Sequence, residues 1–264
     1  MSASRNDRQQ FFLHVVTYYM PEGPSIVLLK EETIQFTGRK VLEADGNTKT
    51  IEKERLLNKK VLEFKSWGKH FLICFNGFTV RIHFLLFGSY SINAPKEGRA
   101  PRLYLRFTNG EIFFYACSVR ILEGDVNDYY DWSGDVLNDA WDERKAREKI
   151  KAIPKALICD TLLNQDIFAG VGNIIKNEVL YRTGVHPESR NGKIPAVKVN
   201  KIIKEARNYS FDFLNWKRQY VLRKHWLAHT KKVCAKCCGP IIRKHTGLNS
   251  RRSFFCTKDQ KLYT

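Results

Sequence analysis

The sequence lacks any apolar run that approaches the ~20 residues needed for a membrane-spanning helix. Its longest apolar segments, such as Phe71–Phe75 and Ile82–Phe87, have only the length of β-strands. Internal repeats and low-complexity tracts are also missing. Because 43% of the 264 residues are hydrophobic and 27% are charged, the composition excludes disorder of the chain as a whole. We therefore expect a folded protein that has no membrane partner.

Acidic residues are scarce in the C-terminal third of the chain. Between Glu188 and Thr264 there are 19 Lys and Arg but only four Asp and Glu, a net charge of +15, whereas the whole chain carries +18. Aromatic residues such as Tyr209, Trp216 and Trp226 lie among these cations. A basic block with interleaved aromatic residues is typical of nucleic-acid binding. The alternative is a solvated basic surface that maintains solubility.

The cysteines do not form the pattern of a secreted disulfide framework, because they number seven and four of them cluster near the C-terminus. Such clustering is typical of a metal site in a reducing cytoplasm. Two ligand pairs, each separated by two residues, can close one tetrahedral zinc site. The ligands predicted in this way are Cys234, Cys237, Cys256 and Asp259. Cys238 and His245 are alternative ligands, and a metal-free hairpin held by packing is the alternative structure.

The hydrophobic pattern changes along the chain and predicts an α+β fold. Apolar residues alternate over about residues 40–122, and Asn-Gly pairs at 76–77 and 109–110 each stand between two β-rich runs. An Asn-Gly pair in this setting is the strongest short signal for a β-hairpin. From Asp135 onward the apolar period becomes helical, and the tail has Gly and Pro turns between short β-like pieces. We predict an antiparallel β-sandwich or barrel, then helices, then a small hairpin.

The segment Met20-Pro21-Glu22 has a reactivity that depends on where the chain starts. An internal proline nitrogen is an unreactive amide, whereas an N-terminal proline is a secondary amine that is partly unprotonated at neutral pH. Attack of that amine on a sugar C1′ gives an iminium cation, which is an electron sink for elimination. Glu22 could act as the acid and base beside it. Taken alone, the segment is equally well explained as a turn.

A second segment, Gly170-Val171-Gly172-Asn173, is expected to open a helix. Glycines allow close approach of a ligand to the backbone, and the free N–H groups at a helix start attract phosphate. A single Gly-x-Gly most often marks a plain turn. Between helices and next to a basic segment, it is a candidate clamp for a DNA backbone.

In combination, these motifs resemble the formamidopyrimidine-DNA glycosylase/endonuclease VIII family. The segments that carry the resemblance are Met20–Ile26, Gly68-Lys69, Gln165–Asn173 with its continuation to Pro187, and Cys234–Gln260. The resemblance spans the chain from Met20 to Tyr263. Pro-Glu-Gly-Pro is closer to the endonuclease VIII branch than to the formamidopyrimidine branch.

The resemblance implies how the chain is divided. Residues 1–19 would be an N-terminal extension that is not part of the active protein. Residues 20–134 would form a catalytic antiparallel β-sandwich, and residues 135–230 a helix–two-turn–helix DNA-binding domain. Residues 231–264 would form a zinc-finger β-hairpin with one structural zinc ion.

The resemblance also implies a function in base excision repair. The protein would be a bifunctional DNA glycosylase and apurinic/apyrimidinic (AP) lyase, a monomer that acts on damaged double-stranded DNA. It would remove oxidised bases, chiefly pyrimidines, through a Schiff base on an N-terminal proline, and nick the strand by β,δ-elimination. A cytoplasmic, nucleoid-associated location fits this function. The alternative is a catalytically inactive protein of the same fold that binds DNA damage.

The resemblance assigns a role to residues in both halves of the chain. Pro21 would be the nucleophile once Met20 is removed, with Glu22 as its acid/base partner. Lys69 would contact phosphate near the lesion and donate a proton during β-elimination; a solvated strand lysine is the alternative.

Four further residues would contact DNA, namely Leu86, Asn173, Arg251 and Arg252. Asn173 would bind phosphate, or serve only as a helix cap. Arg251 would grip phosphate and assist δ-elimination, with Arg252 as a neighbour that could replace it; a generic phosphate contact is the alternative. Leu86 would fill the gap left by a flipped base, or else be ordinary strand core. Leu85 stands where endonuclease VIII relatives often have a polar residue.

Overall fold

The N-terminal half of the protein is an antiparallel β-sheet. The computed structural model describes residues 21–264, so the expected extension and Met20 lie outside the described residues. The sheet has six strands in the order β1-β5-β6-β4-β3-β2. The strands are β1 (Glu43–Asp45), β2 (Glu63–Trp67), β3 (His70–Phe75), β4 (Phe78–Ile92), β5 (Leu103–Phe107) and β6 (Gly110–Glu123). Hairpins join β3 to β4 and β5 to β6 at the two Asn-Gly pairs, as the sequence predicts.

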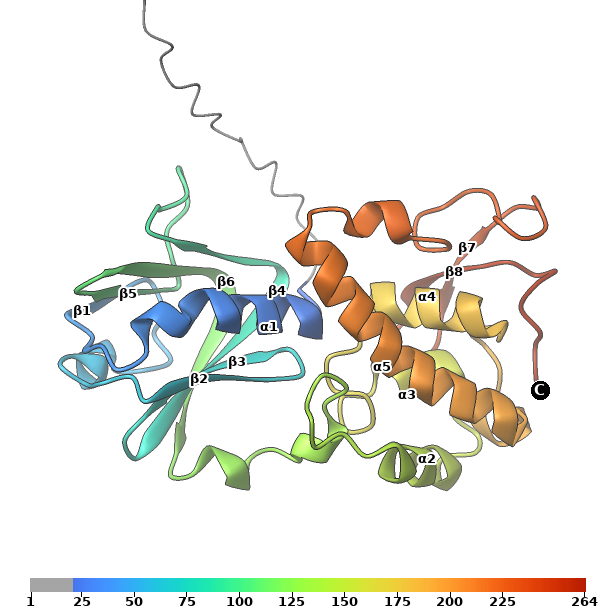
Figure 1. Cartoon of the computed structure of the whole chain (residues 1–264), viewed down its shortest axis with the longest axis horizontal. Coiled ribbons are helices and arrows are strands. Elements are labelled where there is room, and N and C mark those ends of the chain that lie inside the picture. The colour runs from blue at the N-terminus through green and yellow to red at the C-terminus, as the bar shows by residue number, and fades with distance from the viewer. Residues whose placement is uncertain (1–20) are drawn as a thin grey trace, which may run out of the picture.

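Helix α1 (Gly23–Thr33) covers one face of this sheet, as Figure 1 shows. Its residues Ile26 and Leu29 are fully buried against the alternating apolar residues of the strands. The long strands β4 and β6 pair over almost their whole length, but their register shifts between Phe84 and Ser89. This irregularity turns the intervening side chains of β4 out of the core, because one strand gains residues without partners.

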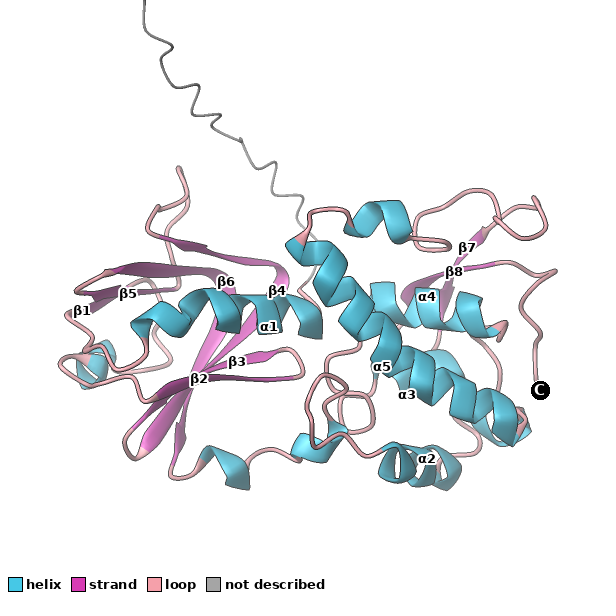
Figure 2. Ribbon diagram, in the orientation of Figure 1, coloured by secondary structure: helices cyan, strands magenta, loops and turns pink. Residues whose placement is uncertain are grey.

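The second half is helical, in agreement with the predicted change of period. Its helices are α2 (Glu143–Ala152), α3 (Ile158–Leu163), α4 (Asn173–Thr183) and α5 (Ala196–Arg218). Figure 2 shows that these helices are separate from the sheet and that α1 reaches the end of α5. Helix α4 is buried on nearly every side, so it is the core helix of this half. Short 3-10 turns lie at Ile34–Phe36, Lys53–Leu56, Val126–Asp128, Trp132–Gly134, Asn191–Lys193 and Leu222–His225.

A two-stranded hairpin of β7 (Ile242–Thr246) and β8 (Arg251–Phe255) completes the fold. It packs on α4, and the tail that follows pairs with the segment after α4 through the hydrogen bond from His186 N to Lys261 O at 2.9 Å. The predicted α+β class is therefore confirmed: an antiparallel sheet, a helical region and a C-terminal hairpin. Among residues 21–264, no helix is both long enough and apolar enough to cross a membrane.

Candidate active site at the junction of sheet and helices

Three segments that are far apart in the sequence meet where the sheet joins the helices. The amide of Gly23 donates to the carbonyl of Gly170 at 2.8 Å. A Cβ atom on Gly23 would lie 2.7 Å from the Cα of Gly170, so only glycine permits this approach. The turn at Gly68 packs on the same segment. A Cβ atom on Gly68 would lie 3.0 Å from the backbone nitrogen of Gly170. The proline segment, the Gly68-Lys69 turn and the Gly170–Asn173 loop thus form one junction.

Glu22 is the centre of this junction. Its side chain is 1% exposed, and its carboxylate accepts the amides of Gly172 at 3.2 Å, Ile174 at 2.7 Å and Ile175 at 3.2 Å. These are the free N–H groups of the first turn of α4, which stabilise a negative charge. Burial nevertheless raises the pKa of Glu22, against the lowering effect of Lys69 and of the three amides. A carboxyl group with a raised pKa holds its proton at a higher pH than an ordinary carboxyl group and can pass it to a reacting atom.

Lys69 is half-buried and is close enough to Glu22 and to Arg251 of the hairpin for both charges to act on it. Desolvation lowers the pKa of the Lys69 ammonium group, the charge of Glu22 raises it, and the charge of Arg251 lowers it again. These interactions place a carboxylate and two cations from three different elements in one electrostatic group. Because it is half-buried, Lys69 is less solvated than an ordinary surface lysine.

Asp135 holds the turn that carries Lys69, and sequence reasoning missed this role. Its carboxylate accepts the amides of Gly68 and Leu137, both at 2.9 Å. Burial raises the pKa of Asp135 to about 6. In the sequence, Asp135 marked only the point where the spacing of apolar residues becomes helical. The available signal for a structural role was an acidic residue directly before the apolar pair Val136-Leu137.

Asn173 stands between two residues whose amides bind Glu22, and Arg251 is close enough to Lys69 for its charge to act on that group. Asn173 is the first residue of α4, and its Oδ1 is buried without a hydrogen-bond partner within residues 21–264. Arg251 and Arg252 begin β8, and both side chains are exposed. Pro21 is half-buried. The structure therefore brings the sequence-predicted residues of both halves toward one region.

Leu86 belongs to an exposed apolar group on β4. Leu85, Leu86 and Phe87 follow one another at the shifted register, and Leu86 is 53% exposed. The alternative that Leu86 is ordinary strand core is therefore wrong. Three exposed apolar side chains in succession are unusual on a soluble protein and mark a surface that contacts something else.

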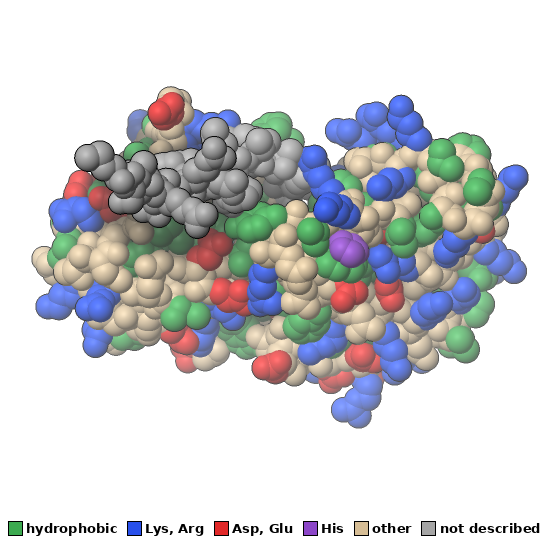
Figure 3. Space-filling model, turned by 45° about the horizontal axis from the view of Figure 1, so that its top comes forward, with side chains coloured by type: hydrophobic (Ala, Val, Ile, Leu, Met, Phe, Trp, Pro, Cys, Tyr) green, Lys and Arg blue, Asp and Glu red, His purple; other side chains and the backbone are tan. Residues whose placement is uncertain are grey.

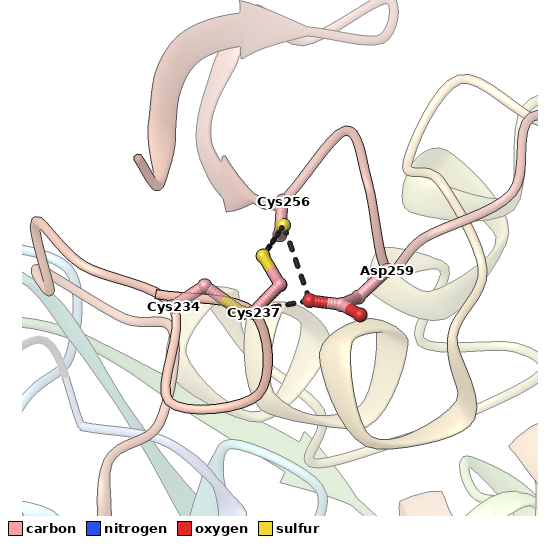
Figure 4. Close-up of side chains that lie close together, drawn as sticks. All are labelled: Cys234, Cys237, Cys256 and Asp259. Carbon is pink, nitrogen blue, oxygen red and sulfur yellow. Dashed lines mark hydrogen bonds between the residues drawn. The ribbon is translucent and has the colours of Figure 1, made fainter. Parts of the chain in front are cut away.

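The predicted metal ligands form a compact cluster at the base of the hairpin, shown in Figure 4. The ligand atoms of Cys234, Cys237, Cys256 and Asp259 all lie within 4.8 Å of one another. The Cys237 and Cys256 sulfurs are 3.4 Å apart, and the Cys234 thiol donates to Asp259 Oδ2 at 2.9 Å. Ligand atoms around a tetrahedral zinc ion are roughly 3–4 Å apart. Three sulfurs and one carboxylate oxygen at this spacing could hold one metal ion.

The alternative ligands lie outside the cluster. Cys238 is exposed, and the Nδ1 of His245 lies 2.6 Å from the carbonyl oxygen of Ser250 in the turn of the hairpin. The Cys234 sulfur also lies 3.1 Å from the hydroxyl of Tyr181 on α4 and accepts the amide of Lys236 at 3.4 Å. A hydrogen bond from outside the ligand set is typical of a built metal site.

Positive charge is widespread on the C-terminal half. On the face shown in Figure 3, Lys and Arg side chains cover much of the helical half and the hairpin. A further buried carboxylate lies in this half: Glu178 on α4 accepts the amides of Leu227, Ala228 and His229 at 2.8–3.1 Å. It ties the segment that leads to the hairpin to α4, and the sequence pattern did not single it out.

Comparison with known proteins agrees with this geometry. A family model described as the formamidopyrimidine-DNA glycosylase H2TH domain matches residues 134–209. Endonuclease 8-like 3 of Bos taurus is 31% identical over 202 residues, which cover 74% of this chain and 33% of that protein. Endonuclease 8-like 2 of Bos taurus is 32% identical over 169 residues, or 59% of this chain and 49% of that protein. The chain spans one third to one half of the length of these curated relatives.

Solved structures with the same fold are also found. The crystal structure of Lactococcus lactis formamidopyrimidine-DNA glycosylase bound non-covalently to DNA with an AP site has a TM-score of 0.81. The two chains are 20% identical, and the match covers 91% of this chain and 99% of that one. A complex of the same protein with DNA that contains N7-benzyl-Fapy-dG has a TM-score of 0.81 at 19% identity, covering 91% of this chain and 100% of that one. At this identity the likeness shows the fold.

Proposed function

Since the chain belongs to the formamidopyrimidine-DNA glycosylase/endonuclease VIII family, on its endonuclease VIII branch, we propose that it is a bifunctional DNA glycosylase and AP lyase. The observation that carries the proposal is the position of Glu22. Its carboxylate directly follows Pro21, is buried at the N-terminus of α4 and interacts with Lys69. Glu22 therefore stands next to Pro21, whose nitrogen would become a secondary amine if the chain began there.

The reaction would begin once Met20 is removed and Pro21 has a free amine. Its nitrogen lone pair forms a bond to C1′ of the damaged nucleotide, and the bond from C1′ to the base breaks. The base leaves with that electron pair and takes up a proton. The new ammonium loses its proton, the C1′–O4′ bond opens, and O4′ takes up a proton to leave an iminium cation. Glu22, whose pKa burial raises, would donate the proton to O4′.

Strand cleavage would follow from the iminium cation. Loss of the C2′ proton lets the electron pair form a double bond while the C3′–O bond breaks and the 3′ phosphate leaves. Loss of the C4′ proton then expels the 5′ phosphate by δ-elimination, and water releases Pro21. Lys69 and Arg251 would bind the phosphates beside these bonds and stabilise their negative charge. Asn173 would bind a neighbouring phosphate.

The substrate class follows from charge and from the exposed apolar side chains. The net charge of +15 over Glu188–Thr264 favours a polyanion, and we assign damaged double-stranded DNA. The choice of oxidised pyrimidines as the bases removed rests on the family resemblance alone. Leu86 would fill the space left by a flipped base. The protein would act as a monomer. One structural zinc ion would be held by Cys234, Cys237, Cys256 and Asp259 and would fix the ends of the hairpin segment.

The deciding experiment compares two versions of the chain on DNA with a pre-formed AP site. One version begins at Pro21 and the other retains Met1. Borohydride reduces an iminium to a stable amine, so the version that begins at Pro21 should be trapped on DNA and the other should not. Glu22→Gln in the first version should keep much of the trapping on AP sites but lose removal of a damaged base. Equal trapping by both versions would disprove the proline mechanism. Binding of damaged DNA without any trapping would favour the alternative, an inactive damage-binding protein.

A further inference from the structure

The hairpin turn that precedes Arg251 is held by a residue outside the site described above. Asp160 on α3 accepts the amide of Leu248 with both carboxylate oxygens, each at 3.1 Å. Gly247 precedes this amide with φ +75°, and a Cβ there would collide with the Asp160 carboxylate. The side chain of Leu248 itself is 93% exposed, so packing does not hold the turn. Within the turn, the Ser250 amide donates to the Gly247 carbonyl at 3.2 Å and His245 Nδ1 lies 2.6 Å from the Ser250 carbonyl oxygen. The bifurcated contact with Asp160 adds a restraint that ties the turn to α3.

The strand that follows Arg251 is held from α4. The Lys176 ammonium group donates to Ser253 Oγ at 2.8 Å and to the Arg252 carbonyl at 3.3 Å. Asn177 accepts the amide of Phe254 at 3.3 Å through its side-chain oxygen. The turn before Arg251 is thus fixed by α3 and the strand after it by α4.

The same helix α4 also binds Glu22 at its first turn. The position of Arg251 relative to Glu22 and Lys69 is therefore set by side chains of the helical half, through contacts made on each side of Arg251. We propose that Asp160 is a positioning residue for δ-elimination, because its contact with the Leu248 amide fixes the turn from which β8 and Arg251 begin. This inference rests on the proposed lyase function.

The test uses Asp160→Ala and Asp160→Asn in the chain that begins at Pro21. Glu148→Ala is the matched control, since Glu148 is an exposed carboxylate on α2 whose loss changes the net charge equally. Three quantities are measured: borohydride trapping on AP-site DNA, the ratio of δ- to β-elimination product, and hydrogen exchange at the Leu248 amide. A loss of δ-elimination product that exceeds the loss of β-elimination product indicates a positioning role for Asp160. General destabilisation would lower both products equally.

Asp160→Ala should lower the rate of δ-elimination relative to β-elimination by about tenfold, the effect of losing one charge-assisted hydrogen bond. Trapping should stay unchanged, and the Leu248 amide should exchange faster. Asp160→Asn should retain part of the ratio, because its amide oxygen still accepts one hydrogen bond, and it replaces the Ala variant if that one does not fold.

An unchanged product ratio in Asp160→Ala or Asp160→Asn would overturn the inference. So would an equal fall in trapping and in both products, because that pattern indicates a purely structural role. The outcome for the proposed function is separate. If the parent chain neither traps nor nicks DNA, the lyase proposal fails whatever Asp160 does.

Discussion

Replacement of Gly172 by Ala should displace Glu22. Gly172 has an extended backbone that any residue can adopt, with φ −119° and ψ −165°, so the substitution adds no backbone strain. The new Cβ would instead collide with the Glu22 side chain. Glu22 would have to leave the first turn of α4 and give up its three amide donors.

The size of the effect follows from these contacts. A hydrogen bond to a charged group contributes about 1.5–3 kcal/mol, and the three bonds share one carboxylate, so they are not additive. We expect a loss of about 3–5 kcal/mol in the free energy of unfolding, as for a buried charge that loses its partners. For a chain of this size that corresponds to a melting temperature roughly 10 °C lower. Base removal should slow by about a hundredfold or more, because the acid/base group is displaced.

The assay pairs calorimetry with excision of an oxidised pyrimidine, and Gly134→Ala is the control. A Cβ on Gly134 meets its nearest neighbour, the carbonyl oxygen of Asp166, at an ordinary 3.6 Å. If the Gly172→Ala protein has the melting temperature of the control and excises bases at the rate of the parent protein, Glu22 is not held as described.

Further predictions concern acidity, metal and salt. Burial raises the pKa of Asp135 from 3.8 to about 6, so its contribution to stability is present at acid pH and lost as the pH rises through about 6; Asp135→Asn should flatten that part of the melting-temperature profile. Asp259→Cys should tighten zinc binding in a chelator titration, since thiolate is the softer ligand, whereas Cys256→Ser should nearly abolish it. DNA affinity should fall steeply with salt, and Lys69→Ala or Arg251→Ala should each lower the slope of log K against log[salt] by about 1.

Local signals in the sequence predicted much of the sheet. The Asn-Gly pairs identified both hairpins, because that dipeptide adopts the turn with little help from the rest of the protein. The exposure of Leu86 was not predictable in the same way. It depends on the register shift between Phe84 and Ser89, and nothing in the local sequence requires that shift.

The site was only partly predictable. Pro21, Glu22, Lys69 and Arg251 were identified by family resemblance, and the structure groups them. Asp135 and Asp160 were missed, because each acts on a backbone amide more than 60 residues away in the sequence. Every residue except proline has a backbone amide, so a sequence motif cannot indicate which side chain will accept a hydrogen bond from a given amide. Only the folded structure reveals such partners.

The carboxylate of Glu22 also has a consequence for how the molecule can move. It comes from the sheet half but is solvated by the backbone of the helical half. Any hinge motion that separated the halves would strip this buried group of its donors before water could replace them. The two halves are therefore held together at the end where Glu22 lies. If the chain binds a duplex as proposed, we expect the DNA to bend more than this junction opens.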